Sequence, residues 1–360
     1  MRRKISLKPI ALVLILFSLF SCKERSEAEK EERKEEVKEF TQHHVKDSYD
    51  FHLFSYTTDS GEEKHIGFPL PILLWDNGLK VFSSAQFHHG EEVAEVDGNY
   101  YKVHHSKIYK VDGPEGEIIE DEHHHAINEK PFDFSITKNV VMIFMMFAIM
   151  FTMFYRMARK HKSNKGMPKG LGRFLEPIVL YVRDEIAIPN IGEKHYKRYM
   201  SYLLTVFFFV WIVNLFGLTP IGMNLTNNIA VTLCLALITY IITTFSGNKN
   251  YWKHIFWMPG VPVPMKIILA PIELLGTFIK PFALMIRLYA NITAGHIVIM
   301  SIIGMVFVLE NWLGSSLSFL LAFVLGILEL LVAALQAYIF TVLSALYFGM
   351  AVEEHHDEHH

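Results

Sequence analysis

The sequence predicts an all-α polytopic membrane protein of about five membrane helices, preceded by a small β-rich extracytoplasmic module. Residues 136–350 contain several apolar runs of about 20 residues or more, the length that spans a bilayer. Residues 23–130 are instead charged, rich in histidine and interrupted by turn residues. The chain is 51% hydrophobic with a net charge of only -3, so nothing in its composition indicates a nucleic-acid partner.

The N-terminus has the order of a secretory signal. Basic residues 2–4 precede an apolar stretch, Ile10–Phe20, and Ser21 stands before Cys22. This pattern predicts a signal peptide over residues 1–22. Cys22 is placed like the lipid-attachment cysteine of bacterial lipoproteins; ordinary cleavage and an uncleaved anchor remain alternatives. Cys234 lies in an apolar run and is expected to be a buried core residue.

Two kinds of segment fill the region before the first membrane helix. Residues 23–40 are nearly all charged and predict a solvated tether. Residues 41–131 contain short alternating stretches separated by turn signals such as Asp76-Asn77-Gly78 and Asp97-Gly98-Asn99. These stretches predict strands at 51–56, 72–75, 80–82, 100–103 and 107–111.

The membrane domain is expected over residues 132–360. Its first span, Ile136–Tyr155, is followed by a dense run of Arg and Lys up to Lys169, which is cytoplasmic by the positive-inside rule. The module before that span is therefore extracytoplasmic. Leu171–Ile188 is too polar to cross and predicts an interfacial amphipathic helix.

Two further spans are ordinary in length. Tyr199–Leu218 crosses outward, and Asn228–Phe245 returns to the basic residues Lys249 and Lys253. This topology agrees with a bacterial plasma membrane, with the C-terminus in the cytoplasm.

The last two apolar segments are unusually long. Pro264–Ile303 and Leu317–Val352 would each be roughly 55–60 Å long as helices, nearly twice the hydrocarbon thickness. Each segment either folds back as a hairpin or lies steeply oblique. We expect two long tilted helices, with Gly304, Asn311 and Gly314 marking the turn between them.

Polar side chains interrupt these two segments. A charge at bilayer depth costs about 3 kcal/mol on insertion scales, so such residues are functional by default and face protein or water. The interrupting residues are Glu273, Lys280, Arg287, Asn291, His296, Glu329 and Gln336.

Helical spacing sorts these residues by face. Asn291 follows Arg287 by four residues and shares its face, and Glu273 lies close to that face too. His296 is nine residues beyond Arg287 and falls on the opposite face, while Glu329 and Gln336 share a face of the second helix. If Arg287 only formed a structural salt bridge, one partner carboxylate would be enough. The pattern instead places a permanent cation on one face and titratable groups on another, which favours a role in ion movement.

The segment from Arg287 to His296, RLYANITAGH, closely resembles the signature of subunit a of F-type ATP synthases. The later segment from Leu335 to Leu343, LQAYIFTVL, matches the end of that family, and Asn214–Pro220, Pro271–Glu273 and Lys280-Pro281 are also similar. The resemblance runs from about residue 130 to 355. Two helices that match in order are far more specific than one Arg-x₃-Asn.

The resemblance implies roles for these residues. Arg287 would be the essential stator arginine facing a rotor ring of small hairpin subunits that carry a membrane carboxylate, with Asn291 and Gln336 beside it. His296 and Glu329 would be the exchanged form of a His/carboxylate pair, and Glu273 and Asn214 would line access channels. Gly217 departs from the pattern because some relatives have Asp there, and Ala290 replaces the more usual Gly.

The resemblance also implies partners. The rest of the ATP synthase, its peripheral stalk subunits and the lipid bilayer would surround the chain, which would not be an enzyme by itself. No cofactor and no metal are expected. The His296–Glu329 pair favours protons over Na⁺, because imidazole and carboxylate relay protons readily.

Other function classes fit less well. A stand-alone transporter or channel would explain the charged midplane residues, but broken helices and internal repeats are missing from the sequence. An intramembrane metalloenzyme would need a His-Glu-x-x-His or comparable cluster, which the sequence lacks. The many histidines of the outer module have no metal-ligand spacing and are interpreted as polar surface.

Overall fold

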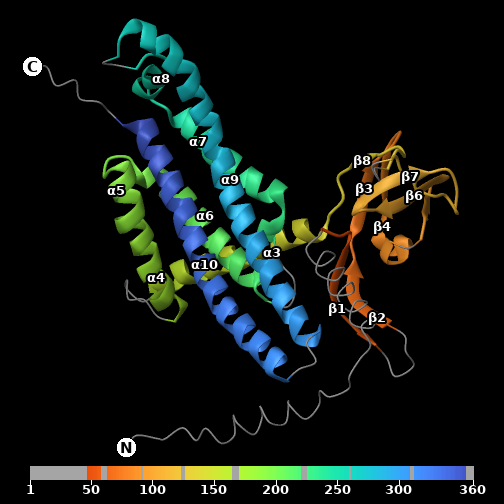
Figure 1. The fold of residues 1–360 in the computed structure, drawn as a ribbon. Helices are drawn as coiled ribbons and strands as arrows, with labels where there is room; N and C mark the ends of the chain where they lie inside the picture. The colour runs from red at the N-terminus through yellow and green to blue at the C-terminus, as the bar shows by residue number, and fades with distance from the viewer. Residues whose placement is uncertain are drawn as a thin grey trace, which may run out of the picture.

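The computed structural model describes residues 47–57, 63–90, 92–122, 126–163, 170–219, 225–258, 261–308 and 312–353. Over these residues a β-rich module precedes a bundle of helices, as expected (Figure 1). The predicted signal peptide, Cys22, the charged tether and the C-terminal histidines lie outside the described residues.

The described part of the module forms three small antiparallel sheets. The first pairs β1 (Asp50–Thr57) with β2 (Glu63–Pro69). The second has the order β4-β3-β8, with β3 at Pro71–Trp75, β4 at Leu79–Ser83 and β8 at Phe132–Asp133. The third joins β5 (Ala94–Val96), β6 (Asn99–His104) and β7 (Lys107–Val111), and a 3₁₀ turn, η1 (Ser84–Gly90), links the second and third sheets.

The tight turns explain several strand boundaries. Asn77 and Gly78 between β3 and β4 both have positive φ, as do Asp97 and Gly98 between β5 and β6. Asn-Gly and Asp-Gly pairs favour this conformation, which matches the twist of the flanking strands. These two turns are therefore where the sequence predicts them.

The buried Asp76 ties the module's sheets together. Its Oδ2 accepts hydrogen bonds from the Tyr101 hydroxyl at 2.9 Å and from the Lys110 ammonium at 2.8 Å. The bond from Lys110 holds the pKa of the Asp76 carboxyl below its ordinary value. Around these groups the module buries Tyr49, Ile72, Leu74, Phe82, Phe87, Ala94, Tyr101 and Ile108.

Five described helices are long and apolar enough to cross a membrane, which confirms the predicted fold class. They are α3 (Lys138–Ser163), α6 (Tyr196–Gly217), α7 (Ile229–Ser246), α9 (Val263–Val308) and α10 (Trp312–Val352).

Two shorter helical segments complete the bundle. The expected amphipathic helix is continuous through α4 (Leu171–Tyr181), a π-helical turn η2 (Val182–Ala187) and α5 (Ile188–Ile191), and it packs against α10. A short helix that the sequence analysis missed, α8 (Lys249–Phe256), follows α7.

Helices α9 and α10 are each continuous, so the fold-back alternative is excluded. With 46 and 41 residues, they would be about 69 and 62 Å long at 1.5 Å per residue, so both must lie steeply oblique to cross a bilayer about 30 Å thick. Figure 1 shows them side by side and oblique to α3.

Three sequence-based expectations are wrong. Gly304 lies inside α9 and Gly314 inside α10, because a glycine is tolerated within a well-packed membrane helix. Asn311, the third predicted turn residue, lies outside the described residues. Cys234 is exposed rather than buried. Lipid is as apolar as the protein core, so an apolar residue of a membrane helix need not face the bundle.

The module and the helix bundle share a core. Phe51 and Leu70 of the module pack with Met142 and Met146 of α3 and with residues of α6. At the start of α3, Asp47 accepts a hydrogen bond from the backbone N–H of Asn139 and so caps the helix from a distant segment.

Candidate functional site

Arg287 lies on the outer face of α9. Leu284, Met285 and Leu288 of the same turn are buried in the bundle core, while the Arg287 side chain is exposed on the face that the bundle leaves uncovered. It makes neither an ion pair nor a hydrogen bond with the residues that the structure describes, and its charge acts electrostatically on Tyr347. Arg287 is therefore available to a group from outside the chain.

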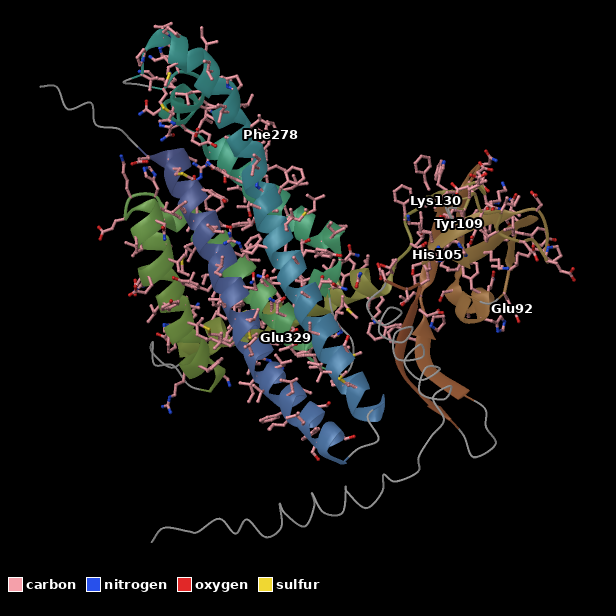
Figure 2. The ribbon with its side chains drawn as sticks, in the orientation of Figure 1. Glu92, His105, Tyr109, Lys130, Phe278 and Glu329 are labelled. Atoms are coloured by element: carbon pink, nitrogen blue, oxygen red, sulfur yellow. The ribbon has the colours of Figure 1, made fainter. Side chains whose placement is uncertain are left out.

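A polar pocket lies on the module side of Arg287. Asn214, Asn291, His296 and Glu329 meet there from α6, α9 and α10, although they are far apart in sequence. The pocket has an empty volume of about 310 Å³, part of it open to solvent. Figure 2 labels Glu329 on α10, within the helix bundle.

Two hydrogen bonds lie beside this pocket, one of them made to the lining residue Asn214. The Thr226 hydroxyl donates to Asn214 Oδ1 at 3.0 Å, and the Thr293 hydroxyl donates to Asn227 Oδ1. Sequence reasoning did not single out Thr226, Asn227 or Thr293. The sequence features that could have indicated these residues are the polar run Thr226-Asn227-Asn228 before α7 and a threonine one turn before His296.

Gly217 also lines this pocket, beside Asn214. The chain has no carboxylate at this position, where some members of the family that the sequence resembles carry Asp. Asn214, which lines the same pocket one turn earlier on α6, supplies an amide there and accepts a hydrogen bond from the Thr226 hydroxyl.

A second polar pocket lies on the α8 side of Arg287, with an empty volume of about 270 Å³ that includes open solvent. Its polar lining comes from Thr239, Tyr240, Thr243, Tyr251, Thr277, Lys280 and Tyr347. Lys280 Nζ lies 5.6 Å from the centroid of the Tyr347 ring, a cation–π contact.

Glu273 belongs to this second region and not to the first. Its carboxylate interacts electrostatically with Lys280 and with Tyr251. Sequence reasoning placed Glu273 near the Arg287 face but did not identify the tyrosines around it.

The spacing along α9 separates the two pockets. Leu284 is the last residue of α9 to line one pocket and Asn291 is the first to line the other, seven residues later, which is about 10 Å along a helix axis. Arg287 lies between them. Neither pocket includes Gln336, which is buried on α10 near Ala333, Ala337 and Phe340.

The described residues contain no group of three or more His, Cys, Asp or Glu side chains that could hold a metal ion. The histidines of the module are therefore not gathered into a metal-binding cluster within this part of the chain. His104 instead lies 3.1 Å from the Glu120 carboxylate.

Comparison with known proteins agrees with this geometry. A family model described as ATP synthase A chain matches residues 140–349, and a second, described as a domain of unknown function (DUF8433), matches residues 40–134. The chain is 42% identical over 238 residues to ATP synthase subunit a of Chloroherpeton thalassium, which covers 64% of this chain and 71% of that protein. It is 43% identical over 235 residues to ATP synthase subunit a of Myxococcus xanthus, covering 63% and 77%.

A longer match extends into the module. The chain is 39% identical over 301 residues to ATP synthase subunit a 2 of Prosthecochloris aestuarii, covering 78% of this chain and 90% of that protein. The family match and the order of the helices support the same conclusion. The chain therefore belongs to the ATP synthase A chain family and is a subunit a, the proton-translocating stator of the membrane sector of an F-type ATP synthase.

Proposed function

We propose that Arg287 is the fixed charge of this stator and that the two polar pockets are its two proton half-channels. One observation carries the proposal: Arg287 is exposed, has no ion-pair partner among the described residues, and lies between the two pockets along α9.

The partner that Arg287 requires is a carboxylate on a moving ring. As a member of its family the chain is a multi-pass membrane protein that assembles with the other ATP synthase subunits. Among these we assign the surface of α9 and α10 around Arg287 to a ring of small hairpin subunits, each with one carboxylate at membrane depth. The peripheral stalk subunits would hold the remaining bundle stationary.

The chemistry at Arg287 is electrostatic. A carboxylate brought within about 4 Å of the guanidinium gains roughly 4 kcal/mol in its ionised form at an effective dielectric constant of 20. Away from Arg287 and in contact with lipid, desolvation favours the neutral acid. The ring carboxylate therefore releases its proton on approaching Arg287 and takes up another on leaving it.

The two pockets give those protons separate routes. On the module side His296 and Glu329 can pass a proton between imidazole and carboxylate, with Asn214 and Asn291 as polar neighbours. On the α8 side Glu273 and the surrounding hydroxyls serve the other half-channel. Arg287 keeps its proton under all these conditions and so prevents protons from slipping between the pockets.

The topology of the proposal follows from the basic residues. Arg and Lys residues gather at the end of α3 and in α8, which by the positive-inside rule favours a cytoplasmic location for these parts. The module over residues 41–131 would then be extracytoplasmic and the C-terminus cytoplasmic, in a bacterial plasma membrane. Each proton that crosses the membrane down a potential difference of 100 mV supplies about 2.3 kcal/mol to the rotation of the ring.

ATP-driven proton pumping in inverted membrane vesicles tests the proposal. Arg287→Ala should abolish the acidification reported by a pH-sensitive dye, while Arg173→Ala, which removes an exposed cation of α4, should retain it. Wild-type pumping by the Arg287→Ala variant in an assembled complex would overturn the proposal.

A further inference from the structure

One face of the module's second sheet is apolar and exposed. Along β3 and β4 alternate side chains point into the module core, among them Ile72, Leu74 and Phe82. The other face of the sheet and the chain after β8 present Leu73, Trp75, Leu79, Val81, Phe132 and Phe134.

These outward residues form one continuous surface. Trp75 is paired across the sheet with Leu79 on one side and with Phe132 on the other. Phe132 and Phe134 are 73% and 69% exposed, and Val81 is 59% exposed. Single exposed apolar residues are ordinary, but a contiguous aromatic and aliphatic face marks a surface that contacts something apolar.

The outward positions of the two longer strands carry no charge. β3 presents Pro71, Leu73 and Trp75, and β4 presents Leu79, Val81 and Ser83. Lys80, which is paired with the inward-facing Leu74, lies on the other side of the sheet and donates to Asp97 at 2.6 Å. The centre of the face therefore has no group that would need water or a polar partner.

Backbone hydrogen bonds place this face at the start of a membrane helix. Phe134 N–H donates to Leu73 O at 2.9 Å, and Ile136 N–H donates to Pro71 O at 3.2 Å. The candidate span α3 begins at Lys138, only four residues after Phe134. Figure 1 shows this short connection between β8 and α3, so the sheet has no linker that could hold it away from the bilayer.

A buried cluster also joins the module to the first turns of α3. Phe51 and Leu70 pack against Met142 and Met146 of α3. Met146 is eight residues into the helix, about 12 Å along its axis. The module therefore shares a buried cluster with the first turns of the span.

We propose that this sheet face is a membrane-binding surface, which rests in the interfacial region of the lipid bilayer beside α3. Aromatic side chains are favoured at that depth, where a ring can lie among headgroups and acyl chains. Phe144, Phe147 and Phe151 are likewise exposed on α3, the helix that follows the sheet in the chain. The module would thereby add a second attachment to the bilayer beside the first helix of the stator.

Spin labels on the intact complex in proteoliposomes test this inference. Val81→Cys and Leu79→Cys place labels on the sheet face, and Glu95→Cys places a matched label on an exposed position of β5 in another sheet. The labelled parent chain, which keeps Cys22 and Cys234, supplies the background. Relaxation by oxygen, which concentrates in lipid, is compared with relaxation by a water-soluble nickel chelate.

If the sheet face contacts lipid, relaxation by oxygen divided by relaxation by the nickel chelate should be several-fold higher for both sheet labels than for the Glu95→Cys label. Equal ratios at all three positions would show the face in water and overturn the proposal. Low relaxation by both reagents would show the face covered by another protein subunit and would overturn it too. Proton pumping by the same samples reports separately on the half-channels.

Discussion

The Glu329 carboxylate lies directly against Gly295 on the neighbouring helix. A methyl group built on the Gly295 backbone would overlap the Glu329 carboxylate oxygen Oε1. Since Gly295 precedes His296, this close approach brings an acid of α10 and an imidazole of α9 to one pocket. The glycine is thus required by space rather than by backbone conformation.

Gly295→Ala should displace the Glu329 side chain and slow proton flow. The atom that must move is the end of a flexible side chain, so the cost in stability should be small, but that side chain is the proposed proton carrier. Gly276→Ala on the same helix is the control, because nothing lies within 4 Å of that position. The account predicts a lower rate of proton uptake by vesicles with Gly295→Ala and a normal rate with Gly276→Ala; equal rates would contradict it.

Single replacement of His296 or Glu329 by Ala should slow ATP-driven pumping by roughly 100-fold, the loss expected for a group that transfers protons. The double variant His296→Glu with Glu329→His keeps both chemistries in the pocket and should pump better than either single variant. Initial rates of dye quenching measure this. A double variant worse than both single ones would count against a functional pair.

The hydroxyl and amide groups that are hydrogen-bonded beside the first pocket should matter less individually. Thr293→Val keeps the shape of the side chain but loses its hydrogen bond to Asn227, worth about 1 kcal/mol. We expect a partial loss of proton conduction. Thr205→Val, which removes a hydroxyl from an exposed position of α6, should have no effect on conduction; a loss equal to that of Thr293→Val would show that the Thr293–Asn227 hydrogen bond has no specific role.

The module should lose stability in acid through Asp76. Because Lys110 lowers the folded-state pKa of Asp76 below the ordinary value of 3.8, the stabilisation is present above 3.8 and is lost as the pH falls through the folded-state pKa. Asp76→Ala should destabilise the module by about 2 kcal/mol at neutral pH, since it leaves the Lys110 bond unmade. Limited proteolysis of the reconstituted chain measures this, with the exposed Asp112→Ala as control; equal cleavage rates would refute the role of Asp76.

Sequence reasoning predicted those parts of the fold that depend on the bilayer itself. The five spans and the two long final helices follow from apolar length alone, and the Asn77-Gly78 and Asp97-Gly98 turns follow from local backbone preference. Strands β2, β5 and β8 and helix α8 were missed. Strands β5 and β8 have only three and two residues, and β8 is held by pairing with β3, which lies far earlier in the chain.

The candidate site was predictable only in part. Charged and amide side chains within apolar helices identified Arg287, His296 and Glu329, since lipid does not tolerate them. The hydroxyl groups of Thr226 and Thr293 give a much weaker signal, because threonine is ordinary in a membrane helix, where its hydroxyl can also bond to the helix backbone. Which polar residues share a pocket depends on how α6, α9 and α10 pack, and one sequence does not determine that.

The separation of two aqueous pockets by Arg287 is tested most directly by cysteine accessibility from each side of the membrane. Leu218→Cys lines the pocket on the module side and Thr243→Cys lines the pocket on the α8 side. In a chain with Cys234→Ala, a membrane-impermeant thiol reagent should reach Leu218→Cys only in right-side-out vesicles and Thr243→Cys only in inverted ones. Reaction of both cysteines from the same side would contradict the two half-channels.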